Sequence, residues 1–187
     1  MADLVQMLLK TGLLQFGRFA VQSGWKPYRL NLHMLPSYPD VLGALIEEAV
    51  PAVGEVDRLV AAADAIPFGV GLSLCTGIPL VYSRGTDEAP VYDLVGAYDI
   101  GHPALLAAGS LNSPELMSRL IGRAKQVGLE IEGVIAVVDE GLFQSAPVRI
   151  HALVKLPSVV EMLVKNDQLP AGQGQMVREW LNRHHPG

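Results

Sequence analysis

The sequence feature that most constrains the fold is a strand–helix–strand pattern within residues 96–141. A short apolar run at 104–108 predicts a buried strand, and a second apolar run at 134–138 predicts another strand over 130–139. Between them, apolar side chains recur at helical spacing up to Gly128, where a glycine is expected to end a helix. Such a unit places two parallel strands side by side in a sheet that helices cover.

The junction between the first strand and the helix is the predicted ligand site. Residues 109–113 form a loop, Ser113 is a favoured N-cap residue, and Pro114 suits the first helical position. In parallel sheets, ligands bind beyond the carboxyl ends of the strands and against a helix N-terminus. This loop, however, contains no carboxylate, no lysine and no cluster of glycines.

The rest of the chain alternates in the same way between helical and extended patterns, with turns at 16–17, 23–24 and 64–69. Further helices are predicted at residues 4–9, 41–49, 69–75, 157–165 and 175–183, and further strands at 19–21, 28–34, 58–62, 80–82, 89–96 and 148–154. Strands that alternate with helices at this density predict an α/β fold with a mainly parallel central sheet flanked by helices.

Composition excludes several classes of protein. A chain of 187 residues with 50% hydrophobic content can bury a full core as one domain. Its net charge of −5 argues against a nucleic-acid partner, and no apolar stretch approaches a membrane span. Asp3 lies too near the start for a signal peptide, so we expect a cytoplasmic protein. Cys75 is the single cysteine, which excludes a disulfide framework, and we expect it to be a small core residue.

One segment resembles a known family. Residues 8–32, LLKTGLLQFGRFAVQSGWKPYRLNL, closely resemble the N-terminal signature of orotate phosphoribosyltransferases, where the segment forms a hood over the orotate. The resemblance continues in order over nearly the whole chain, through residues 67–70, 77–84, 92–96 and 150–154. It implies a type I phosphoribosyltransferase fold with a small N-terminal hood, usually found as a dimer.

The resemblance also implies how one domain, residues 1–187, is organised. Residues 1–36 form the N-terminal helix and hood segment, residues 37–155 the α/β core, and residues 156–187 the C-terminal helices.

The sequence departs from the family pattern in the segments that bind the donor and carry out catalysis in family members. Family members bind phosphoribosyl pyrophosphate with two adjacent acidic residues and a threonine- and glycine-rich turn, but residues 106–114 here read LAAGSLNSP. Arg84 is all that remains of a basic pair, because Gly85 follows it. The loop over 85–99 should bring a lysine and a histidine to the neighbouring active site, yet it has no basic residue and is acidic.

These departures bear on the rate of transfer. Catalysis on such a donor needs positioned cations around the departing pyrophosphate. Losing one such contact typically costs about 3–4 kcal/mol, or a factor of 10² to 10³ in rate. We therefore assign no catalytic residue, no metal-ligating residue and no resident cofactor; Mg²⁺ with phosphoribosyl pyrophosphate is expected if the protein is active.

Seven residues are candidate ligand contacts, and each has a structural alternative. Lys26 matches a family lysine that contacts the donor, or is a solvated surface residue. Arg84 is a phosphate contact or a salt-bridge partner, and Asn31 faces the base or satisfies backbone groups. The remaining four candidates belong to the predicted loop and also serve as turn and cap residues: Gly109, Ser110, Asn112 and Ser113.

One acidic pair lies near the predicted site. Asp139 and Glu140 end the second strand of the unit, where they would either hold a magnesium ion or be solvated at the strand end.

Three functions follow from these observations. The chain is a catalytically degenerate orotate phosphoribosyltransferase-like protein that binds a partner, as a homodimer or as a heterodimer with a catalytic homologue. Alternatively, it binds a nucleotide or a phosphate at the 109–113 loop, in connection with pyrimidine nucleotide metabolism. In the third, it is an active enzyme that transfers phosphoribose to orotate or a related base through an atypical donor site.

Overall fold

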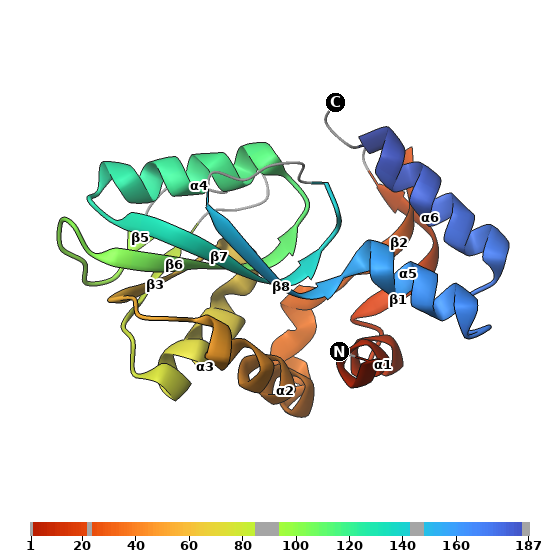
Figure 1. Ribbon diagram of the computed structural model, residues 1–187, viewed down its shortest axis with the longest axis horizontal. Coiled ribbons are helices and arrows are strands. Elements are labelled where there is room, and N and C mark those ends of the chain that lie inside the picture. Colours follow the sequence, from red (N-terminus) through yellow and green to blue (C-terminus); the bar gives the residue numbers. More distant parts are fainter. Residues whose placement is uncertain (1, 22–23, 85–93, 143–147, 185–187) are drawn as a thin grey trace.

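A six-stranded sheet forms the centre of the computed structural model, which describes residues 2–21, 24–84, 94–142 and 148–184 (Figure 1). The strand order is β5-β4-β3-β6-β7-β8, and every neighbouring pair is parallel except β4 and β5. The strands are β3 (Arg58–Ala61), β4 (Leu80–Ser83), β5 (Leu94–Val95), β6 (Pro103–Leu111), β7 (Glu130–Asp139) and β8 (Arg149–Lys155). The predicted α/β fold with a mainly parallel sheet is confirmed.

Helices cover both faces of this sheet. In Figure 1, α4 (Pro114–Gln126) lies on one face, while α2 (Pro39–Ala49) and α3 (Ile66–Thr76) lie on the other. The buried strand β6 serves both faces because successive side chains of a strand point to opposite sides. Leu105 packs with the α2 and α3 layer, whereas Leu106 packs with α4.

The N-terminal hairpin and the C-terminal helix meet at one end of the sheet. Strands β1 (Leu14–Val21) and β2 (Gly24–Leu30) form an antiparallel hairpin after α1 (Ala2–Lys10). The helices α5 (Leu156–Lys165) and α6 (Ala171–His184) follow β8, and Figure 1 shows α6 in dark blue beside the orange β2. Three short 3₁₀ helices complete the described elements: η1 (Leu32–Ser37), η2 (Val50–Ala52) and η3 (Ala63–Ala65).

The strand–helix–strand unit forms as predicted, with one difference at the candidate loop. Ser113 caps α4, because its hydroxyl accepts a hydrogen bond from the Leu116 amide at 3.2 Å, and Gly128 follows the helix at φ +93°. Strand β6, however, continues to Leu111, where the prediction ended it at residue 108. The ladder to β7 extends to Leu111 and Asp139, and burial of Leu111 favours the extended backbone.

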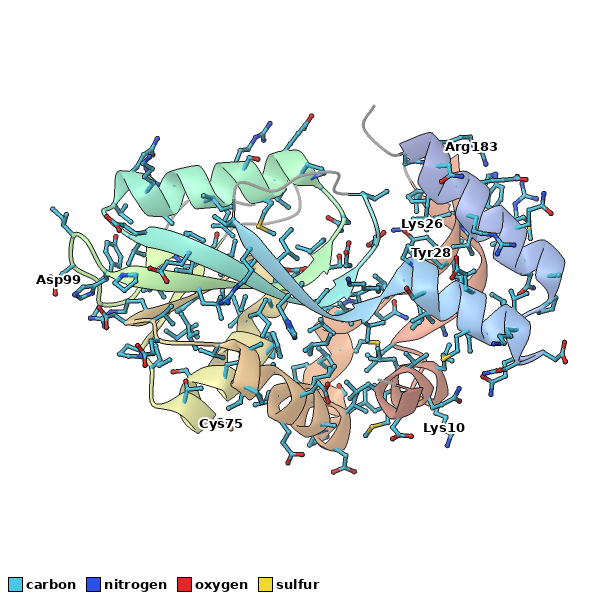
Figure 2. The ribbon with its side chains drawn as sticks, viewed as in Figure 1. Lys10, Lys26, Tyr28, Cys75, Asp99 and Arg183 are labelled. Carbon is cyan, nitrogen blue, oxygen red and sulfur yellow. The ribbon has the colours of Figure 1, made fainter. Side chains whose placement is uncertain are left out.

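Four other predictions need correction. The expected turn at 16–17 is an irregularity of register inside β1, and β2 ends at Leu30, four residues earlier than the predicted strand. Helix α3 begins at Ile66, three residues early, because Pro67 in its first turn is compatible with a helix. Cys75 is exposed on α3 and is not part of the core (Figure 2).

The predicted strand over 89–96 lies partly outside the described residues. Its described part is β5, which pairs antiparallel with β4 at the edge of the sheet. Within the described ranges, no helix combines the length and apolar character needed to cross a membrane.

Candidate functional site

A hollow of about 280 Å³ opens at the carboxyl ends of β3 and β6, next to the start of α4. The position is the one expected for a ligand in a parallel sheet. Its polar wall comes from the β3–α3 connection and from the β6–α4 junction, and its apolar wall comes from α4. The residues that line it are Ala62, Ala63, Asp64, Ala108, Ser110, Asn112, Ser113, Leu116, Met117 and Leu120.

Asp64 connects the two strands at this pocket. It lies in η3, just after β3, and its carboxylate reaches the end of β6. Its Oδ1 accepts a hydrogen bond from the Gly109 amide at 3.3 Å, and its Oδ2 accepts one from the Ser110 amide at 3.0 Å. These two backbone N–H groups therefore face an internal anion, which they hold against the pocket wall.

The charge of the pocket follows from its lining. Among the described lining residues, Asp64 is the charged side chain, and no lysine or arginine accompanies it. Hydroxyl and amide groups of Ser110, Asn112 and Ser113 supply neutral hydrogen-bonding capacity. The pocket therefore suits a ligand that donates hydrogen bonds better than one that brings several negative charges.

The seven candidate ligand contacts predicted from the sequence do not lie together in the structure. Ser110, Asn112 and Ser113 line the pocket, and Gly109 contributes its amide to Asp64. Lys26, Asn31 and Arg84 are not among the residues that line it.

Lys26 belongs to a cluster between the hairpin and α6. Its Nζ forms a salt bridge with Glu140 Oε2 at 2.7 Å and lies 4.1 Å from the ring centre of Tyr28 and 4.9 Å from that of Trp180. Tyr28 also donates a hydrogen bond to Glu140, and its ring meets Trp180 edge-on. Figure 2 shows Lys26 and Tyr28 together on the hairpin beside α6.

Burial controls the chemistry of this cluster. The Glu140 side chain is 1% exposed, so the solvation predicted as one alternative for it is wrong, and its carboxylate instead contacts Lys26 and Tyr28. Burial raises the pKa of the Tyr28 phenol far above its usual value, and the Glu140 carboxylate raises it further. Within the described part of the chain, no group of three or more acidic, histidine or cysteine side chains could hold a metal ion.

Asn31 and Arg84 lie elsewhere. The Asn31 side-chain amide donates to the Gly12 carbonyl at 2.9 Å, which ties the hairpin to the end of α1. Its structural alternative, satisfying backbone groups, thus describes the contact that it makes. Arg84 is exposed and directly follows β4 at the carboxyl edge of the sheet.

The sequence does not predict the contacts that Asp64 and Glu140 make in the structure. A signal for Asp64 existed, because it follows β3 closely, and the carboxyl ends of adjacent parallel strands meet at one edge. No comparable signal links Glu140 with Lys26, which is 114 positions away in the chain.

The fold is that of the type I phosphoribosyltransferases. The chain is similar in structure to a Leishmania donovani UMP synthase, with a TM-score of 0.80 at 22% identity, covering 97% of this chain and 42% of that one. An orotate phosphoribosyltransferase from Francisella tularensis gives a TM-score of 0.73 at 18% identity, covering 98% of this chain and 96% of that one. No family model matches the chain.

Curated sequences show a similarity to one kind of phosphoribosyltransferase. Orotate phosphoribosyltransferase of Sulfolobus acidocaldarius is 22% identical over 189 residues, 96% of each chain. That of Methanocella arvoryzae is 26% identical over 171 residues, 82% of this chain and 93% of the relative. The chain is therefore similar over most of its length to orotate phosphoribosyltransferases, at 22–26% identity to the curated ones, and residues 106–109 of β6 contain no acidic pair.

Proposed function

We propose that this chain binds a nucleotide in the pocket between β6 and α4 and does not transfer phosphoribose, acting in the cytoplasm in connection with pyrimidine nucleotides. One observation carries the proposal. At the end of β6, where relatives are expected to have two carboxylates, Ala108 and Gly109 stand, and the amides of Gly109 and Ser110 already bind Asp64.

The electrostatics of the pocket support binding without transfer. Like charges 4 Å apart repel by about 4 kcal/mol at an effective dielectric constant of 20. A pyrophosphate near Asp64 would meet that repulsion, and the described lining offers no cation to offset it. Bringing the donor to this pocket therefore costs energy where a transferase should stabilise it.

An active enzyme is the second candidate, and a specific observation favours it. Named orotate phosphoribosyltransferases match this chain over as much as 96% of their own length. A carboxylate is also present at the end of β6, supplied by Asp64 from the neighbouring strand. In this alternative, phosphoribosyl pyrophosphate binds with Mg²⁺ through an atypical donor site.

We further propose that the protein acts as a dimer, either with itself or with a catalytic homologue. The apolar residues of α3 are not confined to the face that packs on the sheet. Leu74 is 81% exposed and Val70 is 42% exposed on this helix. A dimer that covered this face would remove both side chains from water.

Calorimetric titration and a turnover assay together test the proposal. We expect orotidine 5′-monophosphate to bind with measurable heat, and phosphoribosyl pyrophosphate with Mg²⁺ and orotate to release no pyrophosphate. Sustained pyrophosphate release would establish the second candidate. Absence of heat from the monophosphate would overturn nucleotide binding and leave the dimer proposal to be tested alone.

A further inference from the structure

The Asp64 side chain lies directly against Gly109 near the end of β6. A Cβ atom added to Gly109 would lie 2.6 Å from Asp64 Oδ2 and 2.9 Å from its Cγ, closer than real Cβ atoms approach such groups. The φ angle of Gly109 is not left-handed, so space and not backbone conformation requires the glycine. The carboxyl group of Asp64 thus occupies the place into which a side chain at position 109 would project.

We infer that Asp64 is the specificity-determining residue of this pocket and that it selects a hydroxyl-bearing ligand of the nucleoside class over a free phosphate. The inference rests on the proposed nucleotide binding and adds that the Asp64 carboxylate binds the hydroxyl groups of the sugar. This carboxylate comes from the segment after β3, and Gly109 of β6 leaves room for it.

The position of Asp64 favours this role. Two backbone amides at 3.0 and 3.3 Å fix the orientation of its carboxylate. Charged groups held in this way need little reorganisation when a ligand arrives. A carboxylate can accept from two adjacent hydroxyls, as in the vicinal diol of a ribose, and repels an anion.

The two walls of the pocket narrow the ligand class. Asp64, Ser110 and Asn112 form a polar side, while Leu116, Met117 and Leu120 of α4 form an apolar side. A ligand with one hydroxylated end and one flat, weakly polar end matches both. The volume of about 280 Å³ suits a small ligand such as a nucleoside, since drug-sized ligand pockets begin at about 300 Å³.

The experiment compares four ligands by titration on the full chain: uridine, 2′-deoxyuridine, uridine 5′-monophosphate and inorganic phosphate. We expect uridine and its monophosphate to bind, 2′-deoxyuridine to bind about ten-fold or more weakly, and phosphate alone not to bind. Losing a hydrogen bond to a charged group typically weakens binding by about ten- to a hundred-fold. The Asp64→Asn variant should therefore bind uridine and 2′-deoxyuridine with nearly equal, weak affinity.

A relocation of the carboxylate makes the test independent of folding defects. Gly109→Asp alone should clash with Asp64 and weaken both stability and binding, and Asp64→Ala alone should abolish the preference for the ribonucleoside. The double variant Asp64→Ala/Gly109→Asp removes the two nearest side-chain atoms, leaves the carbonyl oxygen of residue 64 at 3.1 Å from the new Cβ, and returns a carboxylate to the pocket, so we expect the preference to return. Asp99→Asn removes an exposed carboxylate away from the pocket and is the matched control (Figure 2).

The outcomes separate this inference from the proposed function. Nucleotide binding that is unchanged in Asp64→Asn would overturn the role of Asp64 and leave nucleotide binding intact. Tight binding of inorganic phosphate to the wild-type chain would also overturn it. If no nucleoside or nucleotide binds the wild-type chain, the proposed function fails and this inference fails with it.

Discussion

The pair formed by Lys26 and Glu140 joins segments from three parts of the chain at the scale of single residues. Lys26 lies on β2 and Glu140 follows β7, and Trp180 of α6 covers the lysine from a third side. The two charges are unequally buried, because the lysine is 19% exposed and the glutamate is 1% exposed. Loss of the partner therefore destabilises the protein more when Glu140 is left unpaired than when Lys26 is left unpaired.

That asymmetry predicts an order of stabilities. Lys26→Met leaves a buried carboxylate without its cation, and we expect the free energy of unfolding to fall by about 3 kcal/mol or more. Glu140→Gln keeps an acceptor for Tyr28 and leaves Lys26 able to reach water, so we expect a loss of about 1–2 kcal/mol. Urea denaturation of both variants measures the order. A larger loss in Glu140→Gln would contradict the burial argument.

The start of α4 is the decisive feature at the scale of secondary-structure elements. This helix closes one wall of the pocket, and its first turn is fixed by Ser113 and Pro114. The hydroxyl of Ser113 satisfies the Leu116 amide, one of the N–H groups that a helix start leaves without an internal partner.

Removal of that cap should lower stability by a predictable amount. We expect Ser113→Ala to reduce the free energy of unfolding by about 1 kcal/mol, measured by denaturant titration. Ser118→Ala is the matched control, because Ser118 is exposed within the same helix and alanine is a good helix former. Equal effects in the two variants would show that the cap contributes nothing beyond intrinsic helix propensity.

The whole molecule consists of a covered parallel sheet and a hairpin held by the C-terminal helix. The sheet is closed on both faces, yet α3 still presents Leu74 and Val70 to solvent. The helix is apolar around its circumference, which is the pattern of a helix covered on more than one side. This pattern is the structural basis of the proposed dimer.

The dimer proposal leads to a prediction of mass in solution. We expect wild-type protein to sediment as a dimer and Leu74→Glu to shift it toward the monomer, because a charge at the centre of an apolar interface is costly to desolvate. Ile100→Glu is the matched control, since Ile100 is 89% exposed in the turn before β6 and far from α3 in the chain. Dissociation by Ile100→Glu but not by Leu74→Glu would place the interface elsewhere.

The sequence by itself determined the elements and their order, because local signals define them. The N-cap at Ser113, the glycine at 128 and the strand with its apolar run at 134–138 each depend on neighbours within a few residues, and the structure confirms all three. The edges of elements were less predictable. Strand β6 extends to Leu111 because β7 pairs with it, which no local pattern reports.

The tertiary structure alone decided which residues act together. Asp64 meets Gly109 across 45 positions of sequence, and Lys26 meets Glu140 across 114. A sequence read locally therefore places Lys26 among ligand contacts and leaves Asp64 in a turn. Asp64 meets Gly109 because the neighbouring parallel strands β3 and β6 end at the same edge of the sheet. Lys26 meets Glu140 because a buried carboxylate needs a partner of opposite charge. Both causes exist only in the folded chain.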